Sequence, residues 1–258
     1  MNRMIVWVSV LMAICHFPTQ MSAANLDTES SSTPVTEQRK VASFETIELQ
    51  GSPTIYYQQG KNISVKVVGN AEEVKNLVTE VKDGKLRVYF KSAKVLRLSL
   101  NSREAKKLKI FVTSPDLTDV LLMGSGDFKA CGKIDTDKMT VSVKGSGDIE
   151  IPDLICDHLI AEVLGSGDLE IQKARTQTAK ISLMGSGDVK MGLKKVKKTD
   201  ATLIGSGDID LQLQDCHAVQ CHVRGSGDIT LRGQVVSLQK SKTGSGDIDI
   251  SRLTFLKK

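Results

Sequence analysis

The tetrapeptide Gly-Ser-Gly-Asp occurs seven times from Gly124 onward, and successive copies begin 21, 20, 20, 20, 20 and 19 residues apart. A fixed period near 20 residues is typical of repeat proteins, in which each unit stacks on its neighbours. The glycines of the motif are Gly124, Gly126, Gly145, Gly147, Gly165, Gly167, Gly185, Gly187, Gly205, Gly207, Gly225, Gly227, Gly244 and Gly246. Because the chain must turn sharply at this point of every unit, we expect these glycines to form one tight corner per coil.

Apolar and polar residues alternate on both sides of each corner. Ile149-Glu150-Ile151 follows one motif, and Leu159, Ala161 and Val163 occupy alternate positions before the next. Alternation with period two predicts short strands with one buried face, and helical spacing is missing. Residues 124–258 are therefore predicted to form an all-β parallel β-helix, or β-solenoid, with coils of about 20 residues and two main strands per coil.

The last coil departs from this pattern. Its inward positions are Leu238, Lys240 and Lys242, and the two lysines stand where earlier coils have aliphatic residues. An open sheet end needs protection from pairing with other chains. We interpret the lysines as a polar C-terminal cap.

The N-terminus reads as a secretory signal peptide over residues 1–24, with Arg3, an apolar stretch over residues 5–17 and small residues up to Ala24. Residues 25–40 are rich in Ser, Thr and Glu and are predicted to be a disordered linker. No other segment is apolar enough to span a membrane, so the mature chain is expected to lack a transmembrane segment. These features predict export to the cell surface or periplasm of a Gram-negative-type bacterium.

Residues 41–123 contain predicted strands but no corner motif, and we expect them to cap the N-terminal end of the solenoid. Strands are expected at 47–49, 55–57, 63–68 and 109–113, with a hairpin at Asp83-Gly84 and a short helix at 71–77. A separate catalytic domain is not expected.

The formal net charge of +5 is a mild excess, and aromatic residues make up 4% of the chain. Few aromatic residues and predicted export argue against a nucleic-acid partner. Five basic residues lie close together, most of them in one polar arc between strands: Lys190, Lys194, Lys195, Lys197 and Lys198. This run is interpreted either as a site for an acidic glycan or lipid head group, or as a solvated loop.

Four cysteines follow the predicted signal peptide: Cys131, Cys156, Cys216 and Cys221. Cys156 and Cys216 share a coil position but lie three coils, about 14 Å, apart, which exceeds the reach of a disulfide. Cys221 is expected to face the core. Its neighbour His222 should face the other way, so a zinc site with Cys216 and His217 is not favoured.

The repeated aspartates form a predicted column: Asp127, Asp148, Asp168, Asp188, Asp208, Asp228 and Asp247. Carboxylates about 5 Å apart repel one another by roughly 1 kcal/mol in water. Either each Asp accepts backbone N–H groups of its own turn, or calcium lies between coils. The weak calcium candidates are Asp148, Asp168, Asp188, Asp208 and Asp228, and the first alternative is preferred because calcium-binding Gly-Asp rolls have a nine-residue period. No other metal or cofactor is predicted.

The residue before each corner is apolar in three successive coils, at Leu164, Met184 and Ile204. Strict alternation would point these side chains outward as a stripe suited to an interface between copies. The alternative is that corner residues turn back into the core.

Candidate catalytic residues are scarce. His158, His217 and His222 belong to no recognisable Ser/His/Asp pattern, and Ser and Asp recur in every coil as structural residues do. No catalytic or cofactor-binding residue is predicted, and the chain is not expected to be an enzyme.

The segments Phe44–Leu49, 59–67, 80–90 and 108–115, followed by the Gly-Ser-Gly repeats, resemble the head GIN domain family of auto-transporter adhesins over residues 41–250. The resemblance implies a right-handed, pectin-lyase-like β-helix whose Gly-Ser-Gly corners join two sheets. It also implies cell adhesion without catalytic residues, in a trimeric form.

The sequence therefore favours an exported, non-enzymatic module for adhesion or recognition at the cell surface. Its expected partner is a glycan or protein on a host or neighbouring cell, or a further copy in a homo-oligomer. Two alternatives remain, namely a structural, self-associating envelope protein in the periplasm and a polysaccharide-active enzyme of pectin-lyase shape.

Overall fold

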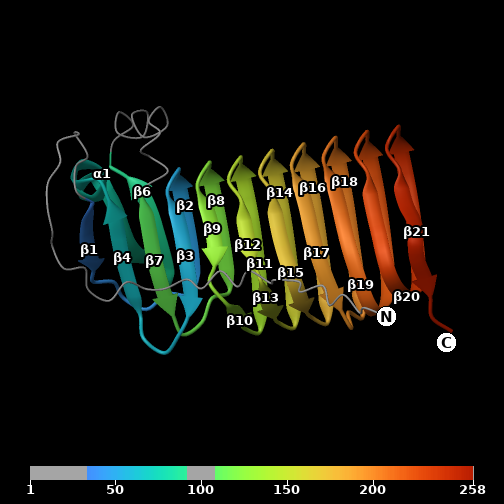
Figure 1. The fold of residues 1–258 in the computed structure, drawn as a ribbon, viewed down its shortest axis with the longest axis horizontal. Coiled ribbons are helices and arrows are strands. Elements are labelled where there is room, and N and C mark those ends of the chain that lie inside the picture. The colour runs from blue at the N-terminus through green and yellow to red at the C-terminus, as the bar shows by residue number, and fades with distance from the viewer. Residues whose placement is uncertain (1–33, 92–107, 258) are drawn as a thin grey trace, which may run out of the picture. The chain divides into compact units, whose positions relative to one another are not determined.

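The computed structural model describes residues 34–91 and 108–257, which belong to one compact unit, Ser32–Lys258. The predicted signal peptide, residues 1–24, lies outside the described residues. The strands of this unit stack side by side in coils (Figure 1). Val35–Arg39, expected to be part of a disordered linker, instead form strand β1, which pairs antiparallel with β4 (Ser64–Gly69).

Each repeat adds one strand to each of two ladders, which meet at the corners. The first ladder contains β8 (Asp119–Gly124), β11 (Lys138–Gly145), β14 (His158–Gly165), β16 (Thr178–Gly185), β18 (Lys198–Gly205) and the second halves of β19 (Asp208–Gly225) and β20 (Ile229–Gly244). The second ladder contains β9 (Asp127–Ala130), β12 (Ile149–Ile151), β15 (Leu169–Arg175), β17 (Asp188–Lys194), the first halves of β19 and β20, and β21 (Ile248–Phe255). Two short strands, β10 (Lys133–Asp135) and β13 (Asp153–Ile155), follow β9 and β12. All pairings within the repeats are parallel, which confirms the predicted β-solenoid.

Inward-facing residues of the two ladders fill the core with aliphatic side chains. Ile181 and Leu183 on β16, and Ile209 on β19, are at most 1% exposed. The coils before the last repeat this pattern, so the core is continuous along the stack. Burying each such side chain contributes about 2 kcal/mol.

The region before the repeats contains an eighth corner, contrary to the expectation that residues 41–123 lack one. Gly51 has a φ of 120° and pairs in register with Gly124. The Ser125 N–H donates to the Gly51 carbonyl at 3.0 Å, and the Asp127 N–H donates to the Pro53 carbonyl at 3.1 Å. Pro53 thus occupies the position of the second glycine and still supports the same turn.

The coil that comes first in the sequence does not lie at the end of the stack but between two later coils. Strands β2 (Thr46–Gly51) and β3 (Thr54–Gln59) pair with β8 and β9 on one side and with β6 (Lys85–Phe90) and β7 (Lys109–Ser114) on the other (Figure 1). Strand β5 (Leu77–Lys82) pairs antiparallel with β6, and β4 pairs antiparallel with β7. Antiparallel strands therefore terminate both ladders at the N-terminal end of the stack.

The hairpin and the short helix of this region are confirmed. Asp83 and Gly84, with φ values of 52° and 71°, join β5 to β6. Helix α1 (Ala71–Asn76) begins at Asn70, whose side chain accepts the Glu72 N–H at 2.9 Å. Such a cap satisfies a backbone donor that would otherwise lack a partner.

Glu48 connects β2 to β6 through a nearly buried ion pair. It is 6% exposed and lies 3.2 Å from Lys85 Nζ and 3.4 Å from Arg87 Nε. Burial alone raises the pKa of Glu48. Hydrogen bonds from Gln50 and Lys85 and the charges of Lys85 and Arg87 lower it by more than burial raises it, so the net pKa is below its usual value. A lowered carboxyl pKa stabilises the fold above the unfolded pKa, and this contribution is lost as pH falls through the folded pKa.

At each corner, backbone lies directly on backbone. The Gly165 carbonyl accepts the Ser186 N–H at 2.9 Å, and the same bond recurs from coil to coil. Gly185 has a φ of 143°, and a Cβ there would lie 1.9 Å from the Gly165 oxygen. Any side chain would separate the two coils at this point, which explains why each coil repeats the glycine.

The aspartates after the corners form a hydrogen-bonded ladder between coils. Asp148 Oδ1 accepts the N–H of Asp168 at 3.0 Å, and Asp168 Oδ1 accepts that of Asp188 at 2.8 Å. The expectation that each Asp accepts N–H groups of its own turn is wrong for the six aspartates before the last, because their donor belongs to the following coil. Asp247, which has no following corner, accepts the N–H of Ile248 from its own turn. The bonds offset the repulsion between the stacked carboxylates.

The last coil carries Lys240 and Lys242 opposite the core residues Cys221 and Val223 of the preceding coil, and both lysines are exposed. Lys242 Nζ pairs with Asp247 at 2.9 Å. The final coil is thus polar where the earlier coils are aliphatic.

We predict that Gly185→Ala lowers the free energy of unfolding by more than about 3 kcal/mol, because it adds both a backbone clash and an unfavourable φ. Gly132→Ala is the matched control, since a Cβ at Gly132 meets no atom within 4 Å. Urea unfolding measures both. Equal stability of the two variants would contradict the close backbone contact.

We predict that Asp188→Ala destabilises the protein by about 1–2 kcal/mol, because it leaves the Asp208 N–H without its acceptor at 3.3 Å. Asp188→Asn keeps an acceptor oxygen and relieves repulsion, so its free energy of unfolding should stay within about 0.5 kcal/mol of the wild type. Urea unfolding in calcium-free buffer distinguishes the two, and a larger loss for Asn than for Ala would refute the ladder.

Candidate functional site

The outer face of the first ladder displays side chains in straight columns, because its strands pair residue for residue. The column next to the corners contains Leu164, Met184 and Ile204 in register. Met184 is 40% exposed and Ile204 is 38% exposed, whereas Leu164 is half-buried. These side chains point outward and do not turn into the core. We call the three residues the apolar stripe.

Cationic residues bound the apolar stripe at both ends. Lys144 pairs with Leu164 on one side, and Arg224 pairs with Ile204 on the other. A partner that covers the stripe would therefore meet apolar surface in the centre and positive charge at the ends.

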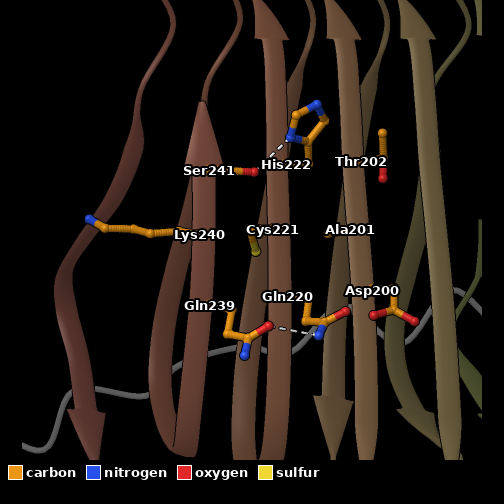
Figure 2. Close-up of a pocket in the computed structure, with 9 residues that line it drawn as sticks. All are labelled: Asp200, Ala201, Thr202, Gln220, Cys221, His222, Gln239, Lys240 and Ser241. Carbon is orange, nitrogen blue, oxygen red and sulfur yellow. Dashed lines mark hydrogen bonds between the residues drawn. The ribbon is translucent and has the colours of Figure 1, made fainter. Parts of the chain in front are cut away.

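A polar groove of about 510 Å³ lies on the same face, over β18, β19 and β20. Figure 2 shows its two rows of side chains: Asp200, Gln220 and Gln239 form one, and Thr202, His222 and Ser241 form the other. Ala201 and Cys221 lie between the rows and are buried. The side chains of each row come from three successive coils.

Hydrogen bonds order the walls of this groove. Gln220 Nε2 donates to Gln239 Oε1 at 2.9 Å, and His222 Nδ1 lies 2.7 Å from the Ser241 hydroxyl. The Asp200 carboxylate pairs with Lys198 at 3.0 Å. Amide, hydroxyl, imidazole and carboxylate groups supply both donors and acceptors, which suits a ligand with several hydroxyl or amide groups.

The buried thiols are protonated near neutral pH. Burial raises the pKa of Cys221 to about 12 and also raises the pKa values of Cys156 and Cys216. Among the described residues, Cys131, Cys156, Cys216 and Cys221 form no disulfide. A buried, protonated thiol is a poor nucleophile and metal ligand.

The metal candidates remain predictions. Cys221 is buried and His222 is exposed, so the two side chains lie on opposite faces as expected. In the ranges 34–91 and 108–257, no group of three His, Cys, Asp or Glu side chains is placed to hold a metal ion. The five calcium candidates each use one carboxylate oxygen in the ladder: Asp148, Asp168, Asp188, Asp208 and Asp228.

The two ends of the aspartate ladder differ in electrostatics. Burial raises the pKa of Asp127 at the N-terminal end. At the C-terminal end, the hydrogen bond from Lys242 lowers the pKa of Asp247. The charged form is therefore disfavoured at Asp127 and favoured at Asp247.

Sequence reasoning missed an aromatic pair on the outer face of the second ladder. Tyr56 and Phe111 stack with ring centroids 5.4 Å apart, and Lys109 Nζ lies 5.9 Å from the Tyr56 ring. The two aromatic residues belong to β3 and β7, which are far apart in sequence but adjacent in space. Only the register between these strands could have revealed the pair.

Among the described residues, no helix is long and apolar enough to cross a membrane, since α1 has six residues.

Solved structures of similar proteins cover most of the chain. A protein from Bacteroides fragilis described as a "putative adhesin" is 27% identical, with a TM-score of 0.73, over 84% of this chain and 97% of that one. A "putative lipid binding protein" from Parabacteroides distasonis is 26% identical, with a TM-score of 0.64, over 83% of this chain and 95% of that one. A "putative adhesin" from Parabacteroides merdae, 16% identical with a TM-score of 0.66 over 84% and 96%, shares the fold.

No curated protein is detectably similar to the chain. The sequence model of one family matches residues 43–215 and 195–257, which together span both the N-terminal coils and the repeats. The chain therefore belongs to the family described as "Putative auto-transporter adhesin, head GIN domain".

Proposed function

We propose that the chain is an exported, non-catalytic adhesion module that binds its partner through the outer face of the first ladder. The observation that carries the proposal is the apolar stripe, where Met184 and Ile204 remain 40% and 38% exposed in successive coils. Membership of an adhesin family supports the adhesive function. The expected partner is a glycan or protein on another cell.

The register of the ladder makes this face a suitable docking surface. Side chains from neighbouring coils stand about 4.8 Å apart on a backbone held by the stacked corners, so little ordering is needed on binding. Covering the exposed parts of the stripe would contribute roughly 1 kcal/mol per side chain. The adjoining polar groove, with Gln220 and His222, supplies the directional contacts.

The same stripe would also suit a second copy of the chain, as in the alternative of a self-associating envelope protein. Adhesion requires the solenoid to lie outside the cell, whereas a structural protein could remain in the periplasm. Location therefore separates the two functions.

We predict that an epitope tag inserted between the exposed residues Lys194 and Lys195, where β17 ends, is cleaved by protease added to intact Gram-negative cells that produce the full chain. Immunoblotting before and after the outer membrane is opened measures this. A tag that is protected until the membrane is opened would exclude adhesion and favour the periplasmic alternative.

We predict that the full chain binds at least one member of a printed panel of neutral glycans and extracellular-matrix proteins. The triple variant Leu164→Ser/Met184→Ser/Ile204→Ser should lose at least tenfold in affinity, because the apolar contact is removed. Val35→Ser/Phe255→Ser is the matched control, since these are the other large apolar side chains exposed among the described residues.

Sedimentation of the same variants completes the test. Unchanged panel binding by the triple variant would remove the stripe from the binding surface. A wild type that binds no panel member but forms an oligomer that the triple variant dissociates would favour self-association.

A further inference from the structure

A glycine opens a depression in the outer face of the second ladder. On β15, Gln172 and Lys173 stand opposite the single residue Gly192 of β17, because the register shifts between Ile171 and Ala174. A Cβ at Gly192 would lie 2.2 Å from the Gln172 carbonyl oxygen. Such a bulge requires glycine for the close approach, and Gly192 lines the surface grooves at this point.

Two grooves meet at Gly192. One, of about 480 Å³, is lined by the basic residues Lys173, Arg175 and Lys194 and by the amides of Gln172, Gln212 and Gln214. The other, of about 270 Å³, shares Gln172, Gly192 and Gln212. We call the first of them the basic groove. It crosses β13, β15, β17 and β19, a distance of roughly 14 Å at the spacing of adjacent strands.

Positive charge in the basic groove is only partly neutralised. Arg175 pairs with Asp153, the one acidic residue of the lining, at 3.2 Å. Lys173 and Lys194 are exposed and have no carboxylate partner among the residues that the structure describes. Two cationic side chains therefore remain available to an anionic ligand.

The predicted basic run divides in the structure. Lys190 and Lys194 lie on β17, and Lys198 begins β18, so most of the run is not a loop. Lys198 pairs with Asp200, and Lys197 Nζ donates to Gln177 at 3.0 Å. Of the five lysines, only Lys194 lines the basic groove, where it joins Lys173 from the preceding coil.

The lining specifies the kind of ligand. Ammonium groups attract carboxylate or sulfate, and side-chain amides donate to and accept from hydroxyl groups. The apolar residues of the lining, Ala174 and Leu193, are 0% and 1% exposed, so the groove has no apolar side chain to insert into a bilayer. A long, polar, concave site of this kind fits an extended chain of acidic sugars better than a membrane surface.

We propose that the basic groove binds an acidic polysaccharide, with Lys173 and Lys194 holding carboxylate or sulfate groups and Gln172, Gln212 and Gln214 holding sugar hydroxyls. This site is separate from the apolar stripe, because it lies on the other ladder and uses different residues. The solenoid would then carry two recognition surfaces.

The test measures binding of the full chain to fluorescent polygalacturonate oligosaccharides and to chondroitin sulfate by anisotropy, with neutral dextran as the reference ligand. We expect binding to at least one acidic glycan and none to dextran. Lys173→Gln/Lys194→Gln should weaken binding at least tenfold, and Lys173→Arg/Lys194→Arg should retain it.

Lys138→Gln/Lys180→Gln is the matched control, since it removes two exposed lysines from the first ladder. Equal weakening by both Gln pairs would reduce the effect to diffuse charge attraction and overturn the proposal, as would failure of the wild type to bind either acidic glycan. Gln212→Leu, which preserves charge, should also weaken binding severalfold, and unchanged binding by this variant would exclude the amides.

Two further measurements separate this proposal from its competitors. Binding to phosphatidylglycerol vesicles without binding to either glycan would overturn it in favour of a membrane surface. The stripe variant Leu164→Ser/Met184→Ser/Ile204→Ser should bind acidic glycan as the wild type does, so failure of the adhesion proposal leaves this one intact.

Discussion

The contact of glycine on glycine at the corners determines most of the structure. At each repeat of the central coils, a Cβ added to one corner glycine would lie about 2 Å from the carbonyl oxygen of the corner glycine in the preceding coil. This contact allows no slip, because a shift of one residue would place a side chain against backbone. Corner stacking therefore fixes the register of both ladders, the alignment of the core and the position of every outward column.

Columns follow from this register, and binding surfaces follow from the columns. Leu164, Met184 and Ile204 form a stripe only because each sits one residue before a corner. The same register aligns Gln220 with Gln239 and His222 with Ser241 across coils. The basic groove arises where the register breaks, since the bulge opposite Gly192 removes one side chain from an otherwise continuous face. Regular coils thus align the apolar stripe and the polar groove, and an irregular one opens the basic groove.

Local pattern was sufficient to predict the solenoid, the hairpin at Asp83-Gly84 and the helix near Ala71. It was insufficient for the corner at Gly51, because Pro53 replaces the second glycine of the motif. The position of β2 between β6 and β8 depends on pairing between segments far apart in sequence, which alternation does not report. The polar groove and the basic groove were missed for the same reason, since each is assembled from side chains of three or more coils.

The ends of the solenoid explain why recognition is assigned to its sides. Antiparallel strands close the N-terminal end, where β1 and β5 finish the two ladders. At the C-terminal end, Lys240 and Lys242 replace core aliphatics, so the charged final coil resists the addition of another strand. End-to-end growth would bury these lysines beside apolar residues at a high desolvation cost. The sides, in contrast, offer exposed apolar and cationic groups at fixed spacing, and a long ligand that follows the stack could contact several coils at once.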